Sequence, residues 1–245
     1  MSPDVARGPC SINSSAVELE AVLAQHASPQ VLSELSEGQR GELGSVGSTS
    51  IQAVVVVGDL RLSGYVLRES ANPSLYARFV VGFTEAIRGL SADCHGWFDK
   101  FTGDGFVAFW PYPDDVHIPT GRVSAFCQAV LPASEMLVAN LRRNSRNFPV
   151  GVGLALGMDA GPCELVRIGG AITVVGSPIV GASRMCSSAC AGETLVNVHL
   201  GNLLEHELRG LESGGLKLRR TVARTKEYPK GQEAYHLTFP RAGPE

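Results

Sequence analysis

The chain has 245 residues, of which 44% are hydrophobic and 18% are charged, as is typical of a globular protein. Its formal net charge of −3 argues against a broad basic surface for nucleic acid. The longest apolar runs are too short to span a bilayer, and the N-terminus lacks the pattern of a signal peptide. The cysteines show no metal-binding spacing, which is typical of a reducing compartment. We therefore expect a cytoplasmic protein that binds neither nucleic acid nor a membrane.

Residues 1–50 differ in composition from the rest of the chain. Short helices are expected near Val17–His26 and Gln30–Leu35, and a Gly/Ser-rich stretch follows from Gly41 to Ser50. We interpret residues 1–50 as an N-terminal appendage and linker, which could serve as a dimer contact. Residues 51–245 are interpreted as the main folded domain.

From Ile51 onward, strand patterns alternate with long helices. The β-branched run Ile51–Leu60 is typical of a strand buried on both faces. Asn72 and Pro73 predict a helix start, and apolar residues recur at helical spacing from Leu75 to Leu90. Two apolar runs then meet at Gly103–Gly105, where the Asp-Gly step predicts a β-hairpin.

The second half of the chain predicts one more long helix and several strands. The helix spans Thr120–Arg143, with a kink expected at Pro132. Further strands are expected at 150–157, 171–176, 194–198, 215–220 and 233–239, with a helix over 181–189. This order predicts an α+β sandwich in which helices pack against one mainly antiparallel sheet.

Two aspartates occupy positions where the presence of a charged side chain calls for an explanation. Asp59 follows a valine-rich buried strand, where an unpaired charge is costly, and Asp104 lies in the hairpin turn. If the hairpin lies beside the first strand, both carboxylates converge at one end of the sheet. Carboxylate and backbone oxygens suit Mg²⁺ or Mn²⁺. Each aspartate alone is also common as a structural residue, so this pair by itself does not establish a metal site.

The surrounding motifs resemble class III adenylate and guanylate cyclases over about residues 51–200. They are Asp59-Leu60-Arg61, Lys100–Asp104, Thr173–Gly176, Ala182–Arg184 and Ala191–Asn197. The resemblance implies a ferredoxin-like class III cyclase sandwich. It also implies that residues 51–245 are a catalytic domain that converts a nucleoside triphosphate to a 3′,5′-cyclic monophosphate and pyrophosphate.

The same resemblance implies a role for each matching residue. Asp59 and Asp104 would hold two divalent metal ions, Mn²⁺ or Mg²⁺, with the carbonyl oxygen of Leu60 as a further ligand. Arg184 would stabilise the transition state, because its guanidinium is always charged and matches phosphate oxygens.

Base recognition and assembly are implied as well. Lys100 and Thr173 occupy the positions that bind the base in this family. Such sites form between two subunits, with the metal aspartates from one chain and the base-binding residues and arginine from the other. A homodimer with shared active sites is therefore implied.

The segment after Asp59 departs from purine cyclases, which usually carry a Phe-Thr pair there. This segment, Arg61–Tyr65, and the stretch 96–110 are similar to the pyrimidine cyclases of bacterial Pycsar antiphage systems, which make cUMP or cCMP on phage infection. Altered base contacts fit a smaller ring, and Tyr65 or Phe98 could fill the space. UTP or CTP is then the expected substrate, and a separate effector that binds the cyclic nucleotide is implied.

Two other readings stay open. Lys100 and Thr173 would also suit adenine, which favours an adenylate cyclase that uses ATP. Val180 and Ser177 stand where the family usually has Asn and Asp, and loss of the Asn removes a polar contact to the ribose. That loss favours a non-catalytic module for nucleotide binding or dimerisation.

Overall fold

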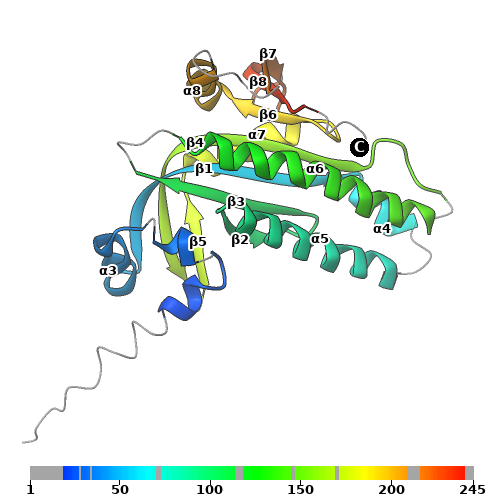
Figure 1. Cartoon of the computed structure of the whole chain (residues 1–245). Coiled ribbons are helices and arrows are strands. Elements are labelled where there is room, and N and C mark those ends of the chain that lie inside the picture. Colours follow the sequence, from blue (N-terminus) through cyan, green and yellow to red (C-terminus); the bar gives the residue numbers. More distant parts are fainter. Residues whose placement is uncertain are drawn as a thin grey trace, which may run out of the picture.

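The computed structural model describes residues 19–27, 29–33, 35–69, 73–113, 118–144, 147–168, 171–208 and 216–240 (Figure 1). Its helices are α2 (Pro29–Leu32), α3 (Glu37–Ser45), α4 (Ser63–Glu69), α5 (Pro73–Asp93), α6 (Thr120–Arg143), α7 (Ser177–Ser188) and α8 (Val198–Leu208). Its strands are β1 (Ser48–Arg61), β2 (Trp97–Phe101), β3 (Gly105–Tyr112), β4 (Gly153–Ile168), β5 (Ala171–Val175), β6 (Thr194–Asn197), β7 (Lys217–Ala223) and β8 (Gln232–Thr238).

The strands form one sheet in the order β2-β3-β1-β4-β6-β8-β7, and β5 pairs with the far end of β4. β1 pairs antiparallel with both β3 and β4 over most of its length. Among the strands that the structure describes, β4 and β6 form the parallel pair. The predicted α+β architecture with a mainly antiparallel sheet is therefore confirmed.

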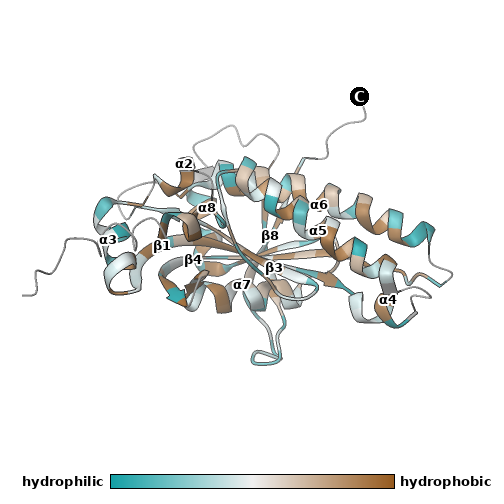
Figure 2. Ribbon diagram, turned by 90° about the horizontal axis from the view of Figure 1, so that it is seen from below, coloured by the Kyte–Doolittle hydropathy of each residue, from teal (hydrophilic) through white to brown (hydrophobic). Residues whose placement is uncertain are grey.

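One face of the sheet is covered by α5 and α6, which lie side by side across it (Figure 1). Val54, Val56 and Leu60 of β1 point to this face, because alternate residues of a strand share a side. Phe106 and Phe126 meet there edge to face, with ring centroids 5.9 Å apart. Figure 2 shows the hydrophobic sides of these helices against the strands and hydrophilic turns on their outer sides.

The opposite face is covered by α7 and by residues 19–43. Val55 of β1 and Trp97 of β2 pack on this face with Leu23 and Leu43, which are both almost fully buried. The N-terminal part also reaches the edge of β2, where the Phe98 amide donates to the His26 carbonyl oxygen at 3.1 Å. His26 Nδ1 lies 3.0 Å from the carbonyl oxygen of Phe98 in return. The described residues between Leu19 and Leu43 are therefore packed onto the sheet.

The Gly/Ser-rich stretch 41–50, expected to be a linker, forms the end of α3 and the start of β1 instead. The helix α3 is stabilised at its N-terminus by a capping box between Ser36 and Gln39. This motif is visible in the sequence, but an interpretation based on amino-acid composition does not detect it. The division of the chain at residue 50 stays a prediction.

The predicted long elements are present, and α4 and α8, like α3, were not predicted. α6 spans Thr120–Arg143 as expected, with Pro132 inside the helix. α4 is short and contains a glycine, and α8 follows β6 without an intervening turn signal, so periodicity did not reveal them. The predicted cap residue Asn72 lies outside the described residues. Within the described ranges, no helix combines the length and apolar character needed to cross a bilayer.

Candidate active site

The two aspartates singled out in the sequence lie side by side where β1 ends and the β2–β3 hairpin turns. We call this end of the strands the edge of the sheet. β1 pairs with β3 in a register that places Asp59 opposite Gly105, the residue after Asp104. The amide of Leu60 donates to the carbonyl oxygen of Asp104 at 3.0 Å. Asp59 alternates with Val57 and so faces the side of the sheet that α7 covers. The hairpin therefore lies beside the first strand, as the metal-site hypothesis requires.

Glycines permit this close approach of the hairpin to β1. A Cβ atom on Gly105 would lie 2.4 Å from the carbonyl oxygen of Gly58 and 2.9 Å from Thr102 Oγ1. Gly103 has φ +92°, a conformation that favours glycine. The residues that flank Asp104 are thus fixed by backbone geometry.

The charges at this edge are only partly balanced. Arg61 Nη1 pairs with Asp59 Oδ2 at 2.7 Å, and the hydroxyl of Ser63 donates to Asp104 Oδ2. Burial raises the pKa of Asp59 above its ordinary value of 3.8, Arg61 lowers it, and the charge of Asp104 raises it further. Burial and the same two carboxylates raise the pKa of the nearby Tyr76 hydroxyl. Among the described residues, Arg61 pairs with Asp59 and no ion pair reaches Asp104, which leaves room for added positive charge.

The donor atoms at this edge fit hard divalent cations. The amide of Leu60 points toward the hairpin, and the amide and carbonyl of one residue in an antiparallel ladder face the same neighbour. The Leu60 carbonyl is therefore directed to the side of Asp104. In the described part of the chain, no three His, Cys, Asp or Glu side chains cluster as a metal site. Two carboxylates and a carbonyl are the incomplete oxygen set that Mg²⁺ and Mn²⁺ complete with substrate phosphates and water.

Arg61, whose contacts the sequence did not reveal, joins this edge to α7. Its Nε donates to the carbonyl oxygen of Ala189 at 3.1 Å, and its Nη2 donates to the carbonyl oxygen of Cys186. The guanidinium thus binds the C-terminal end of α7, where unsatisfied carbonyls attract cations. Asp59 is thereby connected to the helix that carries Arg184.

Arg184 lies apart from the aspartates, in a basic pocket of ≈ 430 Å³. Its Nε is 3.9 Å from Glu227 Oε2, and its guanidinium lies over the ring of Tyr228 at 5.6 Å. The pocket is lined by two segments, α7 and the loop after β7: Val180, Ser183, Arg184, Ser187, Arg224, Thr225, Lys226 and Glu227. The cations at 224 and 226 were missed in the sequence, although the basic character of the Arg-Thr-Lys run was visible. The exposed Val180 lines the same pocket.

Lys100 and Thr173 are brought together from strands that are distant in sequence. Lys100 Nζ on β2 donates to Thr173 Oγ1 on β5 at 2.6 Å. Both contact the buried carboxylate of Asp99, which the sequence analysis did not single out. Across the described ranges, no hydrogen bond or ion pair joins this cluster to Asp59 or Asp104.

The two aromatic candidates differ in their surroundings. Phe98 is buried on the α5 side of the sheet with the guanidinium of Arg88 over its ring, so it cannot fill a base pocket beside Lys100. That prediction was wrong, because strand alternation turns residue 98 away from the side that Asp99 occupies. Tyr65 is exposed on α4, which follows Asp59.

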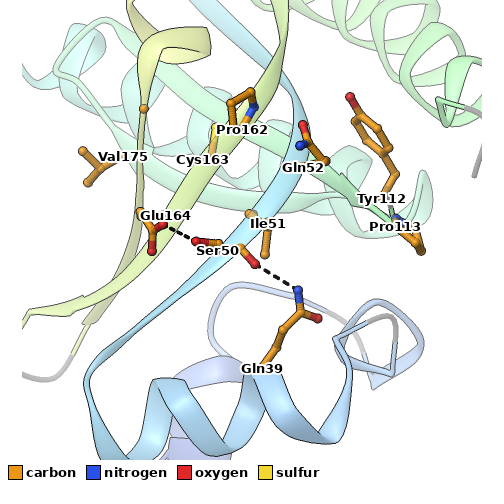
Figure 3. Close-up of a pocket in the computed structure, with 11 residues that line it drawn as sticks. Gln39, Ser50, Ile51, Gln52, Tyr112, Pro113, Pro162, Cys163, Glu164 and Val175 are labelled. Carbon is orange, nitrogen blue, oxygen red and sulfur yellow. Dashed lines mark hydrogen bonds between the residues drawn. The ribbon is translucent and has the colours of Figure 1, made fainter. Parts of the chain in front are cut away.

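A second pocket, of ≈ 250 Å³, lies at the start of β1, far along the strand from Asp59 (Figure 3). Gln39 Nε2 donates to the carbonyl oxygen of Ser50 at 3.0 Å, and the Ser50 hydroxyl donates to Glu164. The lining contains a carboxylate and no lysine or arginine, so this pocket does not suit a triphosphate.

Comparison with solved structures identifies the fold. The adenylyl cyclase CyaB from P. aeruginosa superposes with a TM-score of 0.64 at 18% identity, over 81% of this chain and 99% of that chain. The guanylyl cyclase Cya2 gives 0.61 at 16% identity, over 78% and 92%. The guanylate cyclase domain of RhGC from Catenaria anguillulae, in complex with GTP, gives 0.61 at 14% identity, over 78% and 98%.

Comparisons of sequence alone, with family models and with curated proteins, find no match. The structural likeness nevertheless spans 92–99% of the length of these three cyclase chains. The chain therefore has the fold of a class III nucleotidyl cyclase catalytic domain.

Proposed function

We propose that the protein is a nucleotidyl cyclase that converts a nucleoside triphosphate to its 3′,5′-cyclic monophosphate and pyrophosphate. The observation that carries this proposal is the convergence of Asp59 and Asp104 at one sheet edge, with the negative charge there only partly balanced. A purely structural pair of carboxylates would be expected to have its counter-charges within the chain.

In this reaction the ribose 3′-oxygen attacks the α-phosphorus, and the bond from that phosphorus to the bridging oxygen of pyrophosphate breaks. Asp59, Asp104 and the Leu60 carbonyl would hold two Mg²⁺ or Mn²⁺ ions against the triphosphate. When bound, these ions lower the pKa of the 3′-hydroxyl and neutralise the departing pyrophosphate. The hydroxyl proton passes to solvent.

The basic pocket supplies the remaining positive charge. Arg184 would face the oxygens of the α-phosphate, where charge builds in the transition state. Arg224 and Lys226 line the same pocket and would hold the outer phosphates. Val180 offers no polar atom to the ribose, so these cations have the larger share in binding.

The separation of the residue groups supports a shared site. Lys100 and Thr173 form one cluster, Arg184 belongs to another pocket, and neither is joined to the aspartates by a hydrogen bond or ion pair in the described ranges. We infer a homodimer in which the aspartates of one subunit act with Arg184, Lys100 and Thr173 of the other.

The preferred base is proposed to be a pyrimidine, with UTP favoured over CTP. The support is the likeness of residues 61–65 and 96–110 to the pyrimidine cyclases of Pycsar antiphage systems. A role in phage defence and a separate effector that binds the cyclic nucleotide follow from the same likeness and stay predictions. ATP is the competing substrate, because a lysine and a hydroxyl also match adenine and because CyaB is an adenylyl cyclase.

The test is incubation of the purified chain with ATP, GTP, CTP and UTP separately, each with Mn²⁺. Cyclic UMP or cyclic CMP with pyrophosphate supports the pyrimidine cyclase, and cyclic AMP alone supports an adenylate cyclase. No product from any of the four, with nucleotide still bound, supports the non-catalytic module. The Asp104→Asn variant is the control for a contaminating cyclase.

A further inference from the structure

Asp99 is a buried carboxylate beside the Lys100–Thr173 cluster. Its side chain is 0% exposed, whereas that of Lys100 is 47% exposed. The pairing of β2 with β3 shifts register between Phe98 and Lys100, so Asp99 is the extra residue of a β-bulge. Bulges turn a side chain away from its regular direction and are frequent beside active sites. A fully buried charge in such a place needs several partners.

Asp99 has three such partners, and they come from two strands. Its Oδ1 accepts from the amide of Val174 at 3.2 Å. Its Oδ2 lies 3.2 Å from Thr173 Oγ1 and 3.1 Å from Lys100 Nζ. The carboxylate therefore joins β2 to β5 at the position where Lys100 and Thr173 meet.

These contacts fix the direction of each hydrogen bond. An ionised carboxylate only accepts, so the single hydroxyl proton of Thr173 is donated to Asp99. Lys100 Nζ only donates, so its bond to Thr173 Oγ1 uses one lone pair of that oxygen. One lone pair on Thr173 and one N–H on Lys100 are left for a ligand. The cluster thus presents one acceptor beside one donor.

We propose that Asp99 is a positioning residue for base specificity: it holds Thr173 as an acceptor and Lys100 as a donor toward the edge of the nucleobase. The inference rests on the proposed function, since it assigns the base to this cluster. An Asn at position 99 would donate to Thr173 Oγ1 and, together with the bond from Lys100, would use both lone pairs of that oxygen. The hydroxyl proton would then be free, so Thr173 would present a donor to the base in place of an acceptor. Discrimination between bases would fall even though the cluster stays packed.

The experiment measures Kd for the four 3′-deoxynucleoside triphosphates, which bind but cannot cyclise, by calorimetry with Mn²⁺. In Asp99→Asn, the Kd ratio between the best and the second-best nucleotide is expected to fall about tenfold, because a mismatched donor removes one hydrogen bond to the base. Thr173→Val should cause the same loss, and the double variant should lose no more. Thr173→Ser keeps the hydroxyl and should keep the ratio, as should Asp93→Asn on the exposed end of α5.

The outcomes separate this inference from the proposed function. A wild-type protein that discriminates in binding but forms no cyclic product overturns the cyclase and leaves Asp99 in its role. An Asp99→Asn protein that keeps the wild-type ratio, or weakens all four nucleotides by one common factor, overturns the inference alone. If circular dichroism shows Asp99→Asn to be unfolded, Asp99→Ser takes its place with the same expectation. A wild-type protein that binds none of the four overturns both.

Discussion

Two sites on the same sheet differ in how their charges are balanced: the proposed metal site at Asp59 and Asp104, here called the metal end, and the proposed base site at Lys100 and Thr173, here called the base end. At the metal end, Arg61 pairs with Asp59, Asp104 accepts from the Ser63 hydroxyl, and burial raises the pKa of Asp59. At the base end, the Asp99 carboxylate is satisfied by Lys100, Thr173 and a backbone amide. Within the described residues, the metal end therefore keeps unbalanced negative charge and is the incomplete end, whereas the charges of the base end pair within the chain, which makes it the assembled end.

The difference predicts which variants affect chemistry and which affect recognition. A change at the incomplete end should alter turnover and leave base preference intact. A change at the assembled end should alter preference through KM, because contacts to the base are the same in the ground state and the transition state.

The largest effect is expected at the metal end. Asp104→Asn should abolish turnover, because the amide keeps the bond to Ser63 but removes the negative charge that holds the cations. Calorimetry with 3′-deoxynucleotides should still give the wild-type order of base preference. Full activity in this variant would break the comparison, since it would mean that Asp104 holds no metal.

Mixing two inactive variants tests whether the site is shared between subunits. Asp104→Asn combined one-to-one with Arg184→Ala should regain about a quarter of wild-type activity, because half of the dimers are mixed and each has one intact site. The dimer must first be allowed to exchange subunits, which gel filtration of tagged chains can follow. A mixture that stays inactive after exchange contradicts the shared site.

Arg184→Ala alone is expected to lower kcat by about 10²–10³-fold with little change in KM, as for the loss of one group that stabilises transition-state charge. Steady-state kinetics with the preferred triphosphate measure this split. Arg219→Ala, an exposed arginine on β7, is the matched control and should behave as wild type. If KM rose by a similar factor while kcat stayed unchanged, Arg184 would instead contribute to binding of the substrate in the ground state.

The hairpin geometry can be tested without any substrate. Gly105→Ala should lower the free energy of unfolding by about 1–3 kcal/mol, because its Cβ would lie 2.4 Å from the Gly58 carbonyl oxygen. Gly89→Ala, in α5 with no atom within 4 Å of the new Cβ, should raise it by about 1 kcal/mol. Urea denaturation compares the two. If both substitutions changed the free energy of unfolding by the same amount, the hairpin would not be held closely against β1.

The smallest effect concerns the stability of the metal-free protein. Because the pKa of Asp59 is raised above 3.8, its stabilising contribution is present below pH 3.8 and is lost as pH rises through the raised pKa. Asp59→Asn should therefore raise Tm at pH 7 by more than at pH 4. Glu85→Gln on the outer side of α5 should shift Tm equally at both pH values. A Tm that falls at pH 7 would show that the Arg61 pair outweighs burial.

The metal end could be predicted from the sequence because its signals are local. A carboxylate at the end of a valine strand and an Asp-Gly turn each have a recognisable position, and neighbouring strands of a hairpin sheet bring them together. The same local signals correctly predicted the long helices α5 and α6 and most strands.

The base end could not be predicted to the same depth. The position of Asp99 depends on a bulge in β2, and two of its three partners are more than seventy residues away in β5. The wrong expectation for Phe98 has a different cause, because regular alternation from Trp97 already places Phe98 on the α5 side of the sheet. Arg224 and Lys226 became part of a site only once the loop after β7 was seen beside α7.

The two hydrogen bonds between His26 and Phe98 have a practical consequence for anyone who shortens this chain. β2 is the outermost strand on its side of the sheet, and Phe98 is next to Asp99. A protein that starts at Ile51 would lose this cover and offer an unpaired strand edge to its neighbours, which favours self-association. Dimers seen with such a shortened protein would then need to be distinguished from those of the intact chain.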